Sequence, residues 1–388
     1  MRRLKMMRHF TLILITCLWV APSWATTPLI DEYRDKVEQI IAGFENGNAE
    51  PFTQALDVDA ITGRATEDAF TNLKWKSDFR TGLAQGIKTG VGDRFLSQIA
   101  ADSYIKLLRL KQEGEAGRAL LRFDFGDNGN GYIELFLEHQ PTGEVKVVDW
   151  YDYAMGQRYT TSLRQLVGIM APTPTLAGKL FDIASDRKEV AETLKEIITL
   201  NKQQKHKALV NKFLAQDKTF RRSRLLNLIA IQSANQTNDM GLYRKVLANL
   251  AHYHGSDERL FFILIDYYFL EEKYDEILRG LDKLDAHFGV GDAGLEVYRA
   301  NAYYSKRDYV KAITAANRAI TLEPNYEYGY WSKLLIQTAQ ADYAGGVETI
   351  RSLEERFGYD LSPEALSAQE EYVDLVGSEA YRKWRGSQ

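Results

Sequence analysis

The chain carries the strings KYDEI at residues 273–277, DYVKA at 308–312 and DYAGG at 342–346. Each string places a tyrosine, Tyr274, Tyr309 or Tyr343, directly after a charged residue. The three tyrosines are 35 and 34 residues apart, and a fixed period of this length is typical of stacked helical repeats. One helical hairpin cannot bury its apolar face alone, so we expect at least three units to stack.

The residues around these tyrosines resemble a tetratricopeptide repeat. In that family an aspartate-tyrosine pair opens the second helix of the unit, an alanine follows three residues later, and a proline often ends the unit. The middle unit has all of these features, with Asp308 and Tyr309 followed by Ala312 and Pro324. The resemblance implies a solenoid of helical hairpins, which usually holds partners rather than making or breaking bonds.

The resemblance covers residues 258–357 and extends in a degenerate form back to about residue 160. Arg299 and Lys333 depart from the family pattern, because they stand where the first helices of the family usually have leucine. The final segment, 363–384, is expected to form the capping helix or helices of the array.

The tetratricopeptide resemblance implies a concave wall, lined by the first helices of the units, that receives peptides. By position, this predicted groove comprises Arg259, Phe262, Asp266, Phe269, Asn301, Tyr304, Tyr328 and Trp331. Aromatic side chains mixed with a few polar groups suit peptide capture. The alternative is that some of these aromatic side chains belong to the core or pack against the N-terminal half.

The pattern between residue 30 and about residue 156 is different. Apolar residues at helical spacing predict helices up to about residue 101, one of them over 65–75. The glycines at 82, 86, 90 and 92 lack the ending of a phosphate loop and indicate loops and helix ends. Four strands follow, over 104–110, 118–125, 132–138 and 145–153, with a hairpin signal at 127–131. Helices beside a four-stranded antiparallel meander predict an α+β domain.

Helices followed by a meander resemble the NTF2-like or cystatin-like superfold over residues 30–156. The resemblance depends on the order of the elements and on the strand end VDWYDYAMG at 148–156. Because that superfold includes enzymes, binding modules and dimerisation domains, it does not decide the function. Tyr132, Asp149 and Tyr151 could line a pocket of this fold. The alternative is an aromatic cluster at a strand end, in which Asp149 caps the nearby backbone.

The first 25 residues have the features of a secretory signal peptide. A positive region with Arg2, Arg3, Lys5 and Arg8 precedes an apolar run, and a small-residue site predicts cleavage after Ala25. Removing these four cations changes the formal net charge from −4 to about −8. A nucleic-acid partner calls for a basic face, which this balance does not favour. We expect an exported protein, periplasmic in a cell with an outer membrane.

Cys17 is the single cysteine of the chain and lies within this segment. We expect no lipid on it, because the residues before it form a poor lipidation signal, although lipidation is the competing interpretation. A mature chain without cysteine has no disulfide and no thiolate nucleophile. His252 and His254 are the closest histidine pair, but their spacing places them on different faces of a helix. We therefore predict no metal site and no cofactor.

The sequence contains none of the common hydrolase, phosphate-loop or dinucleotide motifs, so we predict no catalytic residues. The expected organisation is a signal peptide (1–25), an α+β NTF2-like domain (26–158), a degenerate helical region (159–257) and tetratricopeptide-like repeats with a capping helix (258–388). The expected function is that of an exported, non-catalytic scaffold or adaptor that binds a protein or peptide partner. The N-terminal domain could also form a homodimer. The alternative function is small-molecule binding or hydrolysis by the N-terminal domain, with the repeats as a docking module.

Overall fold

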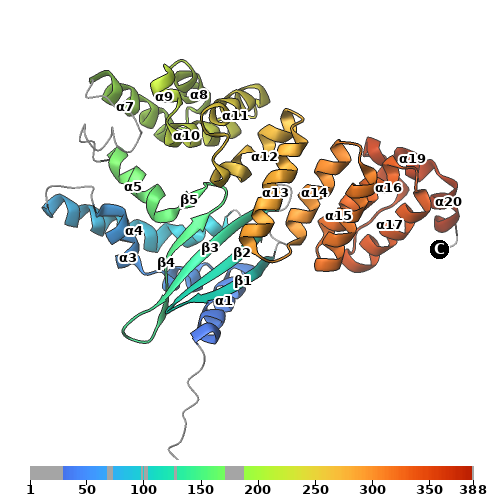
Figure 1. The fold of residues 1–388 in the computed structure, drawn as a ribbon, viewed down its shortest axis with the longest axis horizontal. Helices are drawn as coiled ribbons and strands as arrows, with labels where there is room; N and C mark the ends of the chain where they lie inside the picture. Colours follow the sequence, from blue (N-terminus) through green and yellow to red (C-terminus); the bar gives the residue numbers. More distant parts are fainter. Residues whose placement is uncertain are drawn as a thin grey trace, which may run out of the picture.

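The computed structural model describes residues 29–67, 73–97, 99, 104–125, 129–170 and 188–386. The expected signal segment, with Cys17 and the cleavage position after Ala25, lies outside these residues. An antiparallel sheet with N-terminal helices is followed by a long helical array, which confirms the predicted α+β and then all-α fold class (Figure 1). No helix in the described part of the chain combines the length and the apolar character needed to cross a membrane.

Within the described residues, five helices belong to the N-terminal half: α1 Leu29–Glu45, α2 Glu50–Ala55, α3 Val58–Thr66, α4 Leu73–Leu96 and α5 Tyr159–Met170. The first of these, α1, buries Tyr33, Val37, Ile40 and Phe44 along one face, as expected from their helical spacing. The last, α5, begins just after residue 158, and its Leu163 packs in the same core.

Two expectations for the helical region were wrong. No single helix spans 65–75, because α3 ends at Thr66 and α4 begins at Leu73. The glycines expected to break the chain lie instead within the continuous helix α4. At Gly92 a side chain would place its Cβ 2.4 Å from the Thr53 hydroxyl, so this glycine lets α4 approach α2 closely.

The sheet has five strands in the order β1-β2-β3-β4-β5: β1 Ile105–Glu113, β2 Ala116–Asp124, β3 Asn130–His139, β4 Val145–Asp152 and β5 Gln157–Arg158. The four expected strands form the predicted antiparallel meander. The fifth has two residues and pairs with the end of β4, and so short a strand has no alternating pattern to reveal it.

The N-terminal helices pack on one face of this sheet, and the array packs on part of the other. On β3, Ile133, Leu135 and Leu137 pack among the N-terminal helices, as their alternation predicted. Tyr132 lies on the opposite face and packs against residues of the array. The array therefore rests on the second face of the sheet.

A bulge in β4 decides which residues face the array. Phe136 pairs with Asp149 and Leu137 with Val147, so one residue of β4 has no partner between these pairs. Val147 and Trp150 consequently both face the N-terminal core, although they are three positions apart. Asp149 shares the side of its partner Phe136.

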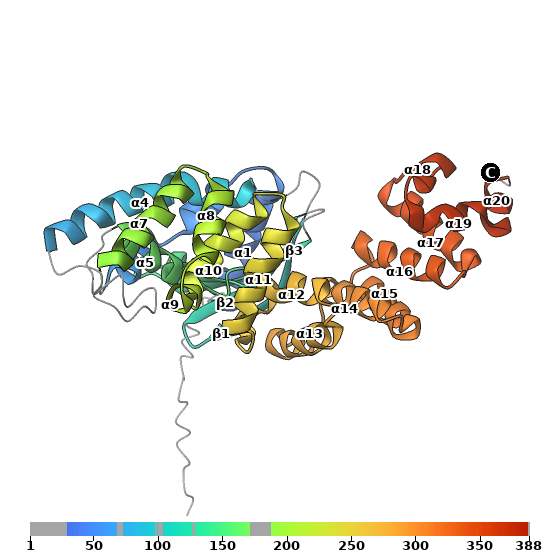
Figure 2. The same ribbon diagram turned by 90° about the horizontal axis from the view of Figure 1, so that it is seen from above.

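The array consists of α7 Lys188–Lys202, α8 His206–Leu214, α9 Lys218–Arg221, α10 Arg224–Asn235, α11 Met240–His254, η2 Glu258–Leu260, α12 Phe261–Leu270, α13 Tyr274–Phe288, α14 Ala293–Ser305, α15 Tyr309–Leu322, α16 Glu327–Ala339 and α17 Tyr343–Phe357. The tyrosines Tyr274, Tyr309 and Tyr343 each form the first residue of the second helix of a pair. Figure 2 shows the array continuing away from the sheet towards the C-terminus.

A left-handed backbone residue marks the same point in five successive hairpins. Gln204, Asn238, Glu272, Arg307 and Ala341 have positive φ angles between 53° and 60° and are the non-glycine residues of the described chain with this conformation. They follow one another at intervals of 34, 34, 35 and 34 residues, and each precedes the next helix by two positions. The helical repeat therefore extends back to α7 and α8, where the sequence pattern is degenerate.

This conformation predicts an unusual effect of glycine. Arg307→Gly should keep or raise the free energy of unfolding, by up to about 1 kcal/mol, because glycine adopts positive φ without steric cost. Arg351→Gly, the same replacement on an exposed position within α17, should instead lower it by about 1 kcal/mol. Urea denaturation of both variants measures the two changes in the free energy of unfolding. Equal losses would contradict the left-handed conformation of Arg307.

The C-terminal elements pack on the last hairpin of the array. They are α18 Pro363–Ser367, η3 Glu370–Tyr372, α19 Val373–Gly377 and α20 Glu379–Arg385. Leu375, Tyr381 and Trp384 join Leu334 of α16 and Leu353 of α17 in one buried cluster. The last hairpin therefore does not leave its apolar face open to solvent.

A buried polar cluster joins the sheet to the array. Arg122 of β2 forms ion pairs with Asp292, which caps α14, and with Glu323, which follows α15. The side chains of Arg122 and Asp292 are 1% and 0% exposed. Burial by itself lowers the pKa of the Arg122 guanidinium, but the neighbouring Asp292 carboxylate raises it, and the net pKa is above its ordinary value.

The other members of this interface cluster are tyrosines. The Tyr132 hydroxyl donates to Asp292 Oδ2 at 2.6 Å, and Tyr104 donates to Glu323. The Arg122 guanidinium also lies 4.4 Å from the centre of the Tyr326 ring. The cluster compensates buried charges with several partners, which holds the two halves in one arrangement.

Candidate functional site

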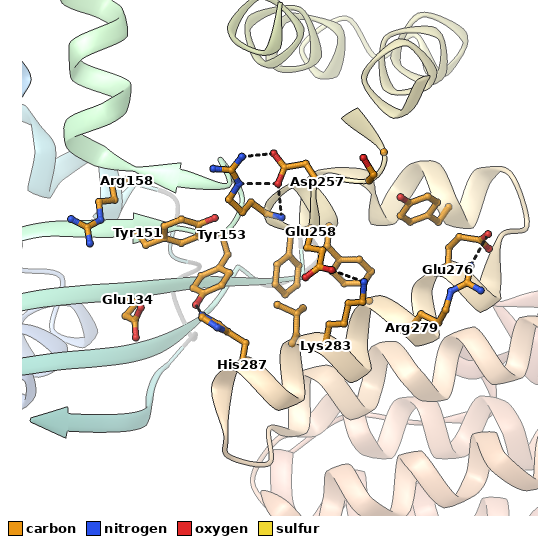
Figure 3. A pocket seen from close by; sticks show the side chains of 18 of the residues that line it. Glu134, Tyr151, Tyr153, Arg158, Asp257, Glu258, Glu276, Arg279, Lys283 and His287 are labelled. Carbon is orange, nitrogen blue, oxygen red and sulfur yellow. Dashed lines mark hydrogen bonds and ion pairs between the residues drawn. The ribbon is translucent and has the colours of Figure 1, made fainter. Parts of the chain in front are cut away.

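A cleft of about 650 Å³ lies where the sheet meets η2, α12 and α13. We call it the junction cleft. Six aromatic side chains line it: Phe136, Tyr151, Tyr153, Phe261, Phe262 and Tyr268. Figure 3 shows Tyr151, Tyr153 and Arg158 on the strand side, with Asp257, Glu258 and Lys283 on the helical side. Neither half of the chain forms this cleft by itself.

The sheet wall of the cleft presents an aromatic ring between two arginines. Phe136 of β3 lies directly opposite Arg118 of β2 in the strand register. The Arg118 guanidinium carbon is 5.2 Å from the centre of the Phe136 ring, and that of Arg158 in β5 is 4.3 Å from it. Both distances are within the range of a cation–π contact.

The helical wall carries a row of ion pairs. Asp257 caps η2 and binds Arg259 at 2.8 Å, and Arg224 lies 3.5 Å from the same carboxylate. Lys283 of α13 binds Glu258 of η2 at 2.6 Å, and within α13 Arg279 binds Glu276 at 3.0 Å. The charges of this wall are therefore largely neutralised within it.

The floor of the cleft is aromatic and partly polar. His287 contacts the Tyr153 hydroxyl at 2.9 Å, and the rings of Tyr151 and Tyr153 are 4.8 Å apart. Burial, followed by the nearby Glu134 carboxylate, raises the pKa of the Tyr153 hydroxyl above its usual range. Tyr153 therefore stays neutral at physiological pH and contributes a neutral hydroxyl to the cleft.

Two glycines allow close backbone contacts around the cleft. At Gly280 of α13 a Cβ would lie 1.9 Å from the Phe261 ring, so the ring packs directly on the helix backbone. At Gly156 in the turn before β5, φ is +60° and a Cβ would lie 2.3 Å from the carbonyl oxygen of Arg259. A side chain at Gly280 would push α12 away from α13, and one at Gly156 would push the sheet away from η2.

Of the three residues predicted to line an N-terminal pocket, Tyr151 lines the junction cleft. Tyr132 is 1% exposed and belongs to the interface cluster. Asp149 is also 1% exposed and accepts bonds from the backbone N–H of Trp150 at 2.9 Å and from the Thr160 hydroxyl at 2.7 Å. Asp149 thus caps nearby backbone, in agreement with the alternative interpretation of this residue.

Of the predicted groove, Arg259 and Phe262 line the same cleft as Tyr151. Phe262 also stacks on Tyr132 of the sheet, with ring centres 5.0 Å apart. The Tyr328 hydroxyl lies 3.4 Å from Asp124 at the end of β2. Part of the wall expected to receive a foreign peptide is therefore in contact with this chain's own sheet.

The remaining groove residues contact other parts of the array. Asp266 accepts a bond from the Tyr243 hydroxyl at 2.9 Å, and Asn301 accepts one from the Ser332 hydroxyl at 3.1 Å. The other three make aromatic contacts: Phe269 with Tyr274, Tyr304 with Tyr309, and Trp331 with Tyr359. These five residues are not among those that line the junction cleft.

The sequence did not reveal Arg118, Phe136 or Arg158 as site residues. The one available signal was Phe136, an aromatic residue on the strand face that also carries Tyr132, Glu134 and Glu138. Their proximity depends on the register of β2 and β3 and on the two-residue strand β5. Neither that register nor the strand β5 could be predicted from the alternation of side chains along a single strand.

Within the part of the chain that the structure describes, no three His, Cys, Asp or Glu side chains are grouped so as to hold a metal ion. His254 contacts the carbonyl oxygen of Arg222 at 2.7 Å, and the neighbouring Asp257 is engaged by arginines. Comparisons with models of protein families and with curated proteins found no match to this chain.

Proposed function

We propose that this protein is a non-catalytic scaffold that binds a segment of a partner protein in the junction cleft. The observation that carries this proposal is the composition of the cleft, in which aromatic side chains from both halves are surrounded by charged groups. Binding surfaces for protein segments have this composition, because aromatic anchors supply most of the binding energy and a polar rim surrounds them.

The helical repeats support the same proposal. Hairpins that recur at 34 or 35 residues form an extended array, and we propose that it is tetratricopeptide-like. In this chain the sheet covers part of the array, through contacts such as those of Tyr132 and Tyr328. The junction cleft is the place where the sheet and the array remain apart, so a partner segment has access there.

The cellular setting is a further part of the proposal. We propose export to the periplasm or cell exterior because of the charged and apolar pattern of the first 25 residues. We also propose an NTF2-like relationship for the N-terminal half, because its helices precede an antiparallel meander. A homodimer formed through this half remains part of the proposal.

Site-specific photocrosslinking in intact cells tests the proposed function. A photoreactive amino acid at Arg158 or Lys283, whose side chains are 49% and 59% exposed at the cleft, should yield a discrete protein adduct. The same group at Val310, which is 72% exposed on α15 and does not line the cleft, is the matched control. Mass spectrometry of the purified adducts then identifies the partner.

Adducts that form equally at Val310 would count against the cleft as the binding site. The absence of an adduct at both cleft positions would count against a protein partner.

The volume of the cleft favours a second candidate function. A cavity of about 650 Å³ is within the range of about 300–1,000 Å³ in which small-molecule sites are found. A soluble ligand would raise the melting temperature of the full-length protein when a metabolite panel is screened. Stabilisation by one compound, together with an absence of protein adducts, would favour this function over the scaffold.

A further inference from the structure

The charges of the junction cleft are divided unevenly between its walls. Five arginine or lysine side chains and four carboxylates line it. The three cations of the helical wall are each paired with a carboxylate of that wall. The fourth carboxylate, Glu134, is paired with Arg109, which lies outside the lining. Among the lining residues that the structure describes, no carboxylate therefore balances Arg118 and Arg158 of the sheet wall.

The acidic neighbours of these two arginines outside the cleft are weak competitors. Arg118 lies 3.0 Å from Glu113, but the two side chains are 37% and 50% exposed, and an exposed ion pair contributes little. Arg158 lies 4.0 Å from Asp149. The Asp149 oxygens already accept bonds from backbone N–H groups and from the Thr160 hydroxyl. Both guanidiniums thus retain donors for a ligand.

Phe136 holds these donors in place. Each guanidinium lies against its ring, at 5.2 Å for Arg118 and 4.3 Å for Arg158. A guanidinium placed on an aromatic ring keeps its planar donors available at the edge, and it loses little freedom when it binds a carboxylate. The sheet wall is therefore arranged in advance for negatively charged groups.

We propose that the junction cleft binds an acidic protein segment, with Arg118 and Arg158 binding its carboxylates. An apolar side chain of the same segment packs against Tyr151 and Phe262, which line the cleft beside the arginines. This inference rests on the proposed scaffold function and names the chemistry of its partner. Charge complementarity carries it, because Arg118 and Arg158 make this wall locally positive although the chain as a whole has a formal charge of −4.

Two arginines at one wall suit a short acidic segment better than a polyanion. A nucleic acid or an anionic membrane is held by many cations spread over one face, whereas each remaining cation of this cleft has a carboxylate of the same wall beside it, which lowers the local net charge. A carboxylate, by contrast, needs one guanidinium with two free donors. The occupant is accordingly a protein segment.

Selection from a random 12-residue peptide library against the full-length protein tests this inference. The peptides that are enriched should contain more aspartate and glutamate than the starting library. Fluorescence anisotropy then measures the Kd of an enriched peptide and of a matched peptide with asparagine and glutamine in place of its acids. We expect binding of the matched peptide to be at least tenfold weaker.

Variants of the protein locate the binding groups. The double variant R118Q/R158Q should bind the acidic peptide at least tenfold more weakly, while R244Q should bind it as the unmodified protein does. Arg244 is the matched control, because it is an exposed arginine that pairs with Glu271 away from the cleft. Circular dichroism confirms that each variant is folded, and R118E/R158E should prefer a peptide with lysine at the acidic positions.

The outcomes separate this inference from the proposed function. Protein adducts in cells, combined with enriched peptides that are not acidic, would overturn the inference and leave the scaffold in place. An unchanged Kd in R118Q/R158Q would overturn it as well. If no peptide is enriched, or if inorganic phosphate binds to these arginines and acidic peptides do not, the acidic segment is excluded.

Discussion

Asp292→Ala is expected to lower the free energy of unfolding by about 3 kcal/mol or more. The Asp292 carboxylate is fully buried, and it binds Arg122, the Tyr132 hydroxyl and the backbone N–H of Leu295. Removing it leaves the buried Arg122 guanidinium with one carboxylate partner, Glu323, in place of two. It also leaves the Tyr132 hydroxyl and the Leu295 N–H without an acceptor. Chemical denaturation of the full-length protein, followed by circular dichroism, measures the loss.

Asp308→Ala is the matched control for this variant. Asp308 caps α15, the helix that follows α14, and accepts a bond from the Lys311 backbone N–H. It lies outside the buried clusters of the described residues. Its replacement should cost much less, because only a helix cap and an exposed ion pair with Lys311 are lost. Similar losses at Asp292 and Asp308 would show that the interface cluster adds nothing beyond helix capping.

A second variant examines the charges themselves. Arg122→Met alone should be strongly destabilising, whereas Arg122→Met combined with Asp292→Leu should recover part of the loss. The double variant removes both members of the ion pair and leaves apolar groups of similar size. A double variant less stable than both single variants would contradict an ion pair at this position.

Separating the two halves of the chain is also expected to have a large effect on stability. The sheet places Leu120, Tyr132 and Tyr153 in one buried cluster with Phe261 and Leu295 of the array. A fragment of residues 29–170 would expose these side chains together with the Arg122 charge. We expect that fragment to bind a hydrophobic dye strongly and to lose the cooperative thermal transition, since contiguous exposed apolar surface of this kind is unstable in water.

A nicked protein is the control for cutting the chain. A protease site placed within residues 171–187 and cleaved after folding should leave the halves associated, with a melting temperature close to that of the intact protein. Mixing the separate fragments 29–170 and 188–386 should restore the transition. A separate 29–170 fragment that melts as cooperatively as the intact protein would show that the interface contributes little.

The sequence by itself determined most of the secondary structure and its order, although it missed β5 and the boundary between α3 and α4. Strand periodicity predicted the four long strands and the side-chain alternation on β3, and the tetratricopeptide resemblance implied second helices that begin at Tyr274, Tyr309 and Tyr343. These features are local, because the helical and strand periods are properties of neighbouring residues. The glycines of α4 show the limit of that argument, since Gly92 is required by contact with α2 and not by a turn.

Only the tertiary structure decided where the site lies. The extra residue in β4 places Asp149 and Tyr151 on the same side as Phe136 and so sets the side of the sheet that they face. Packing of the array on that side then brings Tyr151 into the same cleft as Phe262, which is more than a hundred residues away in the sequence. Strand register and packing between halves depend on contacts between distant residues, which no local pattern encodes.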